Sequence, residues 1–417
     1  MLEQIKGKVY NRLRWSEKYT KTDMVYLTKG SFWLSVGNIA SMASAFLLSI
    51  AFANLLPPET YGTYKYILSI VGIISIPTLY GMTTAITQAV ARGNEGTLMP
   101  ATNTRIRWGL LSGLASLVAA GYYYYGHNYT LTICFLITAC FLPFMDTLNT
   151  YFSFLAGKKL FRDQTALKII SQILIVATTI LNLYLTKNLL LVIFVYFSSR
   201  TVINFVLYKF TIKKYRPNQL VDAKAISYGK HLTLIGVLGL IAGQLDKILI
   251  WHYLGAIELA VYSFALAPVD QANSAIFNNI NTLAMPKLSE NDPKTIRDTL
   301  PGKIMKILPL TIIMALVYIA AAPFLYKLIY PQYIGAAVYS RFYAFSLAIL
   351  PLSTFNTALA AQAQKKKLYF LSFTVSGFKI LLLTLLLPPY GIAGAITSIL
   401  ATQAYSNIAQ YYLFKRM

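Results

Sequence analysis

"GQLDKILIWHYLG", residues 243–255, places an acid and a base, Asp246 and Lys247, side by side in a largely apolar segment. The apolar run that contains it covers residues 232–254, which is long enough to cross about 30 Å of hydrocarbon as a helix. Ionisable side chains are costly in lipid, so this pair predicts either a structural contact between helices or a polar passage. The surrounding sequence determines how the pair is interpreted.

The composition of the whole chain indicates a membrane protein. Of its 417 residues, 56% are hydrophobic and only 12% are charged, and the mean hydropathy is +0.55. These values do not fit a water-facing surface. Backbone amides in hydrocarbon must bond within their own segment, and the alternation that a β-barrel requires is missing. The sequence therefore predicts an all-α, polytopic membrane protein.

Twelve apolar stretches of spanning length follow one another, separated by short polar breaks. We expect helices at residues 31–55, 65–89, 108–125, 130–155, 167–186, 189–208, 232–254, 259–283, 305–327, 342–363, 369–388 and 392–414. The chain is thus predicted to form a bundle of twelve transmembrane helices.

Lys and Arg residues are concentrated in alternate breaks. The first 29 residues, the breaks after even-numbered spans and the C-terminus hold all 37 basic residues except Lys65, Lys187, Arg200, Lys247, Lys327, Arg341 and Lys379. Cationic loops resist translocation, so both termini are expected in the cytoplasm. The same asymmetry explains the net charge of +23 without a nucleic-acid partner, because basic loops also attract anionic headgroups.

Motifs for metals, cofactors or catalysis are missing. The two cysteines, Cys134 and Cys140, lie on one span without metal-ligand spacing, and the three histidines are scattered. There is no GxxxxGK[ST] loop for a nucleotide. We therefore expect no cofactor, no metal and no catalytic residues, which favours a transporter over an enzyme.

An internal repeat divides the chain. "NTYFSFLAGKK" (149–159) aligns without gaps to "NTALAAQAQKK" (356–366), with five identical positions. A displacement of six helices with equal orientation predicts two parallel six-helix lobes about a pseudo-two-fold axis along the membrane normal. The expected boundaries are a basic cytoplasmic tail at 1–29, an N-terminal lobe at 30–208, a cytoplasmic linker at 209–231 and a C-terminal lobe at 232–417.

Two turns give a more specific resemblance. "LLPPETYGTYKYILSI" (55–70) joins spans 1 and 2, and "LGAIELAVYSFALAPV" (254–269) joins spans 7 and 8 after "QLDK". Both resemble signatures of the polysaccharide and oligosaccharide flippases, of the O-antigen translocase type, in the superfamily of multidrug, oligosaccharidyl-lipid and polysaccharide exporters. The resemblance implies a V-shaped two-lobed fold and transfer of undecaprenyl-diphosphate-linked sugars.

Six ionisable residues lie near the middle of the predicted spans, where each costs roughly 3 kcal/mol. They are Asp146, Arg200, Asp246, Lys247, Asp270 and Lys379. They should therefore face a shared interior. The family resemblance implies that cavity bases hold the diphosphate; Lys247 is at the comparable position, and Arg200 and Lys379 are candidates by depth. The acids Asp246, Asp270 and Asp146 are candidates for ion coupling, while an interhelical structural pair remains an alternative for Asp246 and Lys247.

Polar side chains also recur on one face of two spans. Ser35 and Asn38 belong to such a stripe in span 1, and Asn273 and Asn281 to one in span 8. The stripes predict either a wet cavity surface or close helix packing, since small and polar residues also join helices in lipid.

We therefore expect a flippase that moves a lipid-linked oligosaccharide across the bacterial cytoplasmic membrane by alternating access between its lobes. Its partners are a polyprenyl-diphosphate-linked glycan and the lipid bilayer, and a polysaccharide polymerase or chain-length machinery is a further candidate. The first alternative is a cation-coupled multidrug antiporter of the same superfamily. The second is a membrane polysaccharide polymerase or ligase, which the short outer breaks disfavour.

Overall fold

The computed structural model describes residues 24–290, 292–362 and 364–416. The predicted basic tail lies almost entirely outside these residues. Within them the chain is helical with short connections and contains no strand. This confirms the all-α prediction.

The N-terminal lobe contains six spans, two of which are broken. They are α2 (Met24–Leu55), α3 (Pro58–Ile74) with η1 (Ile76–Thr78) and α4 (Met82–Ala91), α5 (Leu98–Tyr125), α6 (Tyr129–Met145) with α7 (Thr150–Gly157), α8 (Phe161–Leu185) and α9 (Leu189–Tyr215). A short 3-10 helix, η2 (Glu95–Thr97), precedes α5. Residues 216–222 then connect this lobe to α10.

The C-terminal lobe repeats the pattern. Its first three spans are α10 (Ala223–Tyr253), α11 (Ala256–Glu290) and α12 (Pro293–Ile329), and η3 (Pro331–Tyr333) follows α12. The next span is broken into α13 (Ala336–Tyr343), α14 (Phe345–Ala348), η4 (Leu350–Ser353) and α15 (Thr354–Ala361). The last helix is α16 (Lys365–Lys415). The backbone of α16 is non-helical at Gly391, where φ is 56°. Two spans therefore meet there.

Twelve spans result from this arrangement. Seven helices in the described chain are long and apolar enough to cross a membrane, and two bent pairs, at 53° and 49°, raise the number to nine. The helices α5 and α11 have spanning length, and α16 is two spans joined at Gly391. Most helices extend beyond the predicted spans at their charged ends, because helices continue past the hydrocarbon.

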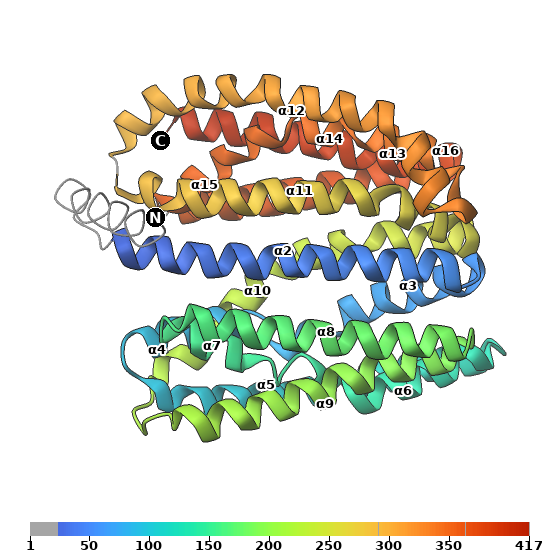
Figure 1. Ribbon diagram of the computed structural model, residues 1–417, viewed down its shortest axis with the longest axis horizontal. Coiled ribbons are helices and arrows are strands. Elements are labelled where there is room, and N and C mark those ends of the chain that lie inside the picture. Colours follow the sequence, from blue (N-terminus) through green and yellow to red (C-terminus); the bar gives the residue numbers. More distant parts are fainter. Residues whose placement is uncertain (1–23, 291, 363, 417) are drawn as a thin grey trace, which may run out of the picture.

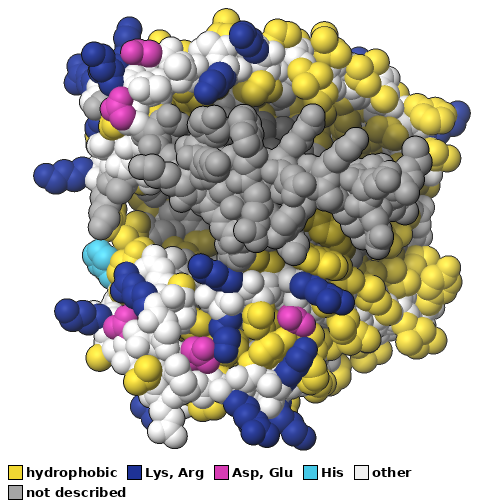
Figure 2. Space-filling view, turned by 60° about the vertical axis from the view of Figure 1, so that its left-hand side comes forward, with side chains coloured by type: hydrophobic (Ala, Val, Ile, Leu, Met, Phe, Trp, Pro, Cys, Tyr) yellow, Lys and Arg dark blue, Asp and Glu magenta, His cyan; other side chains and the backbone are white. Residues whose placement is uncertain are grey.

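The lobes lie one above the other in Figure 1, with α2 between the remaining helices of each. α2 begins and α16 ends at the same end of the bundle, which we call the termini end; the opposite end, with the α2–α3 and α10–α11 turns, is the far end. Figure 2 brings the termini end forward and shows its Lys and Arg side chains in two groups, one above and one below.

The apolar cores show where the lobes are joined. One cluster in the far half contains residues of both lobes, including Phe52, Tyr61, Phe264 and Tyr330. In the termini half the core is divided: one cluster belongs to the N-terminal lobe and the first turn of α10, and another to α11, α12, α15 and α16. Among the described side chains, several helices of both lobes share one apolar cluster in the far half, whereas in the termini half only the first turn of α10 joins the core of the N-terminal lobe.

A polar contact keeps α10 attached to the N-terminal lobe at the termini end. The Gly81 amide donates to the Thr233 hydroxyl at 3.1 Å, and the Tyr80 hydroxyl donates to the Thr233 carbonyl at 3.3 Å. The helices α4 and α10 thus hold the two lobes in contact in the termini half.

Candidate functional site

In the Asp246–Lys247 pair, the Asp246 side chain is buried and the Lys247 side chain is partly exposed. Asp246 is buried and accepts a hydrogen bond from the Tyr262 hydroxyl of α11 at 2.5 Å. The Lys247 side chain is 28% exposed, and its Nζ lies 3.9 Å from Asp246 Oδ1. Weak contacts of 3.3–3.4 Å join this ammonium to the Gln244 amide and the Gly243 carbonyl. Lys247 therefore forms a long ion pair with Asp246 and remains partly exposed.

Asp270 and its neighbours extend this cluster. The Asp270 side chain is exposed although it lies 14 residues into α11, and it accepts a hydrogen bond from the Tyr343 hydroxyl at 2.7 Å. Lys379 lies 14 residues into α16 and is partly buried.

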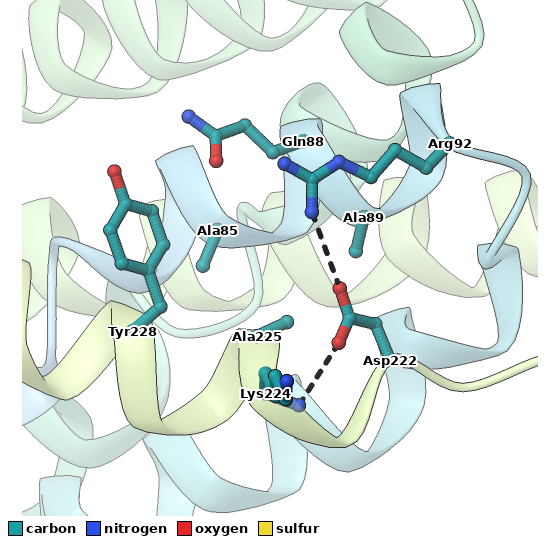
Figure 3. Close-up of a pocket in the computed structure, with 8 residues that line it drawn as sticks. All are labelled: Ala85, Gln88, Ala89, Arg92, Asp222, Lys224, Ala225 and Tyr228. Carbon is teal, nitrogen blue, oxygen red and sulfur yellow. Dashed lines mark hydrogen bonds and ion pairs between the residues drawn. The ribbon is translucent and has the colours of Figure 1, made fainter.

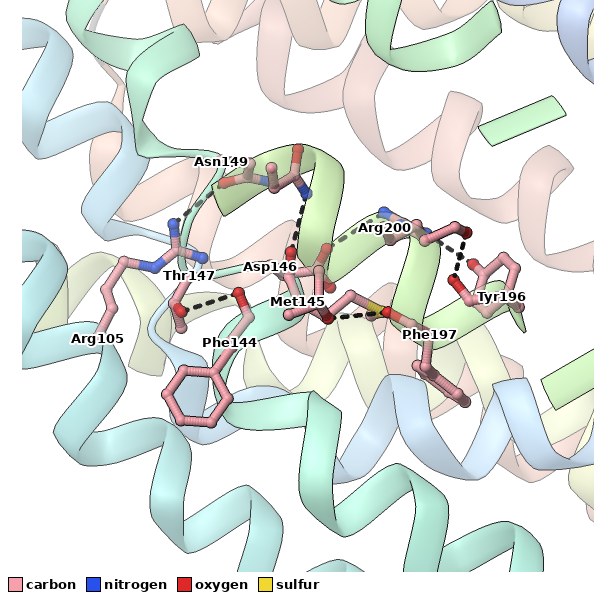
Figure 4. A network of polar contacts seen from close by, with 12 residues as sticks. Arg105, Phe144, Met145, Asp146, Thr147, Asn149, Tyr196, Phe197 and Arg200 are labelled. Atoms are coloured by element: carbon pink, nitrogen blue, oxygen red, sulfur yellow. Dashed lines mark hydrogen bonds and ion pairs between the residues drawn. The ribbon is translucent and has the colours of Figure 1, made fainter. Parts of the chain in front are cut away.

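Asp146 and Arg200 form a second group in the N-terminal lobe (Figure 4). Arg200 Nη2 lies 3.2 Å from Asp146 Oδ1, and both side chains are 31% exposed. Arg200 Nη1 donates to the Tyr196 hydroxyl at 2.6 Å. Asp146 is at the end of α6, where the span breaks before α7, so the ion pair stabilises a helix end.

Two basic residues of this region were missed by sequence reasoning. Arg105 was assigned to a cytoplasmic break but lies inside α5 at 2% exposure. It donates to the Thr78 carbonyl at 2.8 Å and to Asn149 Oδ1 at 3.3 Å. Lys65 was counted with the outer residues, but it is partly buried in α3 with its Nζ 5.4 Å from the Tyr61 ring centre. Only its position inside the "YGTYKY" turn could have singled it out.

The charged residues inside the spans come from both lobes. Lys65, Asp146 and Arg200 belong to the N-terminal lobe, whereas Asp246, Lys247, Asp270 and Lys379 belong to the C-terminal lobe. Arg200 and Lys247, in the interior of their helices, and Asp146, at the end of α6, are all partly exposed. Together with Arg105 this set holds five bases and three acids, so its net charge is positive.

An aromatic cluster joins the two lobes at the far end. Tyr61 of α3 stacks on Phe264 of α11 with ring centres 4.5 Å apart, and Phe264 also contacts Tyr330 and Tyr333 at 5.4 and 4.2 Å. All four side chains are buried. Ser49 and Tyr330 add a hydrogen bond of 3.1 Å between the lobes. Access is therefore blocked at the far end.

The polar stripes take part in helix contacts. Asn38 accepts a hydrogen bond from Lys168 of α8 at 3.4 Å, and Asn273 donates to the Ser346 hydroxyl at 3.2 Å. Ser35 is partly buried on α2. The side chain of Asn281 lies outside the described residues.

A separate pocket of about 330 Å³ lies between α4 and the start of α10 (Figure 3). Arg92 Nη1 is 3.9 Å from Asp222 Oδ2 across it, and Lys224 and Tyr228 complete the polar lining. None of the predicted site residues lines this pocket. It belongs to the contact that holds α10 on the N-terminal lobe.

Comparisons with known proteins agree with this architecture. The family model described as "Polysaccharide biosynthesis protein" matches residues 27–292. No curated protein matches the sequence.

Among solved structures, an outward-facing multidrug-resistance MATE transporter of the MOP superfamily has a TM-score of 0.69 at 11% identity, covering 94% of each chain. A MOP-superfamily transporter from Pyrococcus furiosus, described by a reverse polarity of its binding pocket, has a TM-score of 0.64 at 11% identity, covering 94% of this chain and 95% of that one. A Vibrio cholerae MATE transporter has a TM-score of 0.58 at 14% identity, covering 94% and 96%.

The structural neighbours share the two-lobed transporter fold, and the family model covers more than half of the sequence. The chain belongs to the polysaccharide biosynthesis protein family.

Proposed function

We propose that this protein is a flippase that carries a polyprenyl-diphosphate-linked oligosaccharide across the bacterial cytoplasmic membrane by alternating access. The termini end is the cytoplasmic end, as the distribution of basic residues predicts. The glycan head enters between the lobes there, while the polyprenyl tail stays in the bilayer.

The observation that carries this proposal is the positive balance of the charged set, five bases against three acids, with Lys247 partly exposed and only a long ion pair of 3.9 Å to Asp246. Each of the three acids already has a partner: Asp146 has Arg200, Asp246 has Tyr262 and Asp270 has Tyr343. The set therefore carries more positive than negative charge, and an anionic ligand such as a diphosphate would neutralise the excess.

The membrane potential can drive such a step without a coupled ion. Outward movement of negative charge across an inside-negative membrane is favourable by about 2.3 kcal/mol per charge per 100 mV. Two net negative charges on the diphosphate would gain about 5 kcal/mol. Collapse of the potential in proteoliposomes should then slow transfer of the diphosphate lipid.

The decisive variant is Lys247→Ala, assayed for transfer of a polyprenyl-diphosphate oligosaccharide in proteoliposomes. A charge-assisted contact contributes about 1.5–3 kcal/mol, so transfer should fall roughly 10- to 100-fold. Lys327→Ala removes an exposed lysine at the far end of α12 and should leave transfer unchanged. Equal transfer by Lys247→Ala and the original protein would remove the substrate-binding assignment.

Cation-coupled antiport is the second candidate, favoured by the exposed Asp270 inside α11 and by the MATE neighbours. It predicts that Asp270→Asn abolishes uptake of a cationic dye driven by a proton or sodium gradient. Dye transport without glycolipid transfer by the original protein would replace the flippase proposal with this one.

A further inference from the structure

A second cavity opens at the far end, on the seam between the lobes. Its volume is about 650 Å³, within the range of small-molecule sites. The N-terminal lobe contributes the first turns of α3 and α6, and the C-terminal lobe contributes the end of α10 and the turn into α11. The polar or aromatic lining residues are Glu59, Thr60, Thr63, Asn128, Thr130, Trp251 and His252.

The lining offers unused hydrogen-bonding groups. Glu59 and Thr130 make no side-chain hydrogen bond or ion pair among the described residues, and both are exposed. The Asn128 carbonyl caps α6 by accepting from the Leu131 amide, which leaves its NH₂ free to donate. The indole N–H of Trp251 is buried without a partner in the described chain. The cavity therefore presents both donors and acceptors.

One ring gives this cavity a rigid wall. Trp251 stacks on Tyr66 with ring centres 3.9 Å apart and an interplanar angle of 11°, and Tyr66 shares a hydrogen bond with Tyr123. A carboxylate, an amide, hydroxyls and an indole together match a ligand with many hydroxyls and apolar C–H faces. The only carboxylate in the lining is Glu59, and no Lys or Arg accompanies it, so phosphates and acidic sugars are disfavoured.

We propose that this far-end cavity binds a neutral saccharide. The proposal rests on the proposed function in one respect, namely that this end faces outward, where a transferred glycan is present. Both lobes build the cavity, so a bound saccharide stabilises the state in which the far end is closed. Saccharide outside the membrane would therefore slow further transfer.

The test is saturation-transfer NMR on the full chain in nanodiscs, with maltose, N,N′-diacetylchitobiose and maltotetraose as probes. The original protein should bind at least one probe. Thr130→Trp, which fills the cavity from the exposed first turn of α6, should weaken binding at least 10-fold, and Glu59→Gln should weaken it several-fold. Thr397→Trp makes the same change at an exposed threonine of α16 outside the cavity and should have no effect.

Absence of binding by every probe, or binding unchanged by Thr130→Trp, would overturn the proposal. Lys247→Ala separates it from the proposed function, because that residue is not part of the cavity lining. If the flippase proposal fails, Lys247→Ala transfers glycolipid normally while the NMR result stands. If the cavity proposal fails, Thr130→Trp binds saccharide normally while Lys247→Ala still loses transfer.

Discussion

Individual charged residues explain how this chain keeps ions inside a membrane bundle. Each acid predicted from the sequence has a hydroxyl or guanidinium partner on another helix, as Asp246 has Tyr262 and Asp146 has Arg200. Depth in an apolar run was enough to find these acids, since an unpaired charge there is costly. Depth did not find Arg105, because its neighbours Arg107 and Asn103 make the surrounding sequence look like a loop. The partners could not be predicted, since they depend on how helices pack.

Arg105 should be a stability residue. It joins the break between α3 and α4, through the Thr78 carbonyl, to the break between α6 and α7, through Asn149. Arg105→Met would leave that buried carbonyl without its donor, which costs about 1–3 kcal/mol. We expect a lower thermal midpoint in detergent. Arg107→Met, an exposed position on the same helix, should leave the midpoint unchanged, and equal midpoints for the two variants would contradict this role.

The helices show which structural features were readable from hydropathy alone. Twelve apolar runs predicted the spans, and the run at 189–208 begins at the first residue of α9. The breaks at 75–81, at 146–149 and around η4 were not predicted, because each lies inside a stretch that is apolar enough over its whole length to be read as one span. Prolines stand at or near these breaks, as Pro77 and Pro351 show, but a proline alone does not distinguish a bend from a complete interruption.

Gly391 separates the last two spans because its backbone adopts a conformation that interrupts the helix. Its φ of 56° lies in the left-handed region, and a Cβ there would meet only Leu254 at ordinary contact distances of 3.7–3.9 Å. Gly391→Ala should therefore destabilise the protein by about 1–2 kcal/mol through strain. Gly377→Ala, in the preceding span with open space around it, should be neutral or stabilising by up to about 1 kcal/mol. Thermal unfolding of both variants measures whether each substitution raises or lowers stability. If both change stability in the same direction, strain at Gly391 does not determine the effect.

At the scale of the molecule, the division of the apolar core describes a two-lobed bundle that is closed at one end. One core cluster joins the lobes in the far half, and two separate clusters lie in the termini half. The repeat of "NT" and "KK" at 149–159 and 356–366 was sufficient to predict two lobes. It could not predict which end is closed, because that depends on contacts such as Tyr61 on Phe264 between distant segments.

Alternating access requires the far end to open, so a covalent link across it should stop transfer. Gln332 Nε2 donates to the Asn54 carbonyl at 3.4 Å between the lobes, and both residues are exposed. In a chain with Cys134→Ala and Cys140→Ala, the pair Asn54→Cys and Gln332→Cys should form a disulfide on oxidation. Glycolipid transfer should then fall to background and return on reduction.

A second pair tests whether the position of the link matters. Gln172 donates to the Ser41 hydroxyl at 2.8 Å, and both residues belong to the N-terminal lobe. The pair Ser41→Cys and Gln172→Cys links α2 to α8 within that lobe, so its oxidation should leave transfer unchanged, because helices that move together are not restrained by a bond between them. Continued transfer with the link between residues 54 and 332 fully formed would mean that substrate crosses without separation of the lobes at the far end.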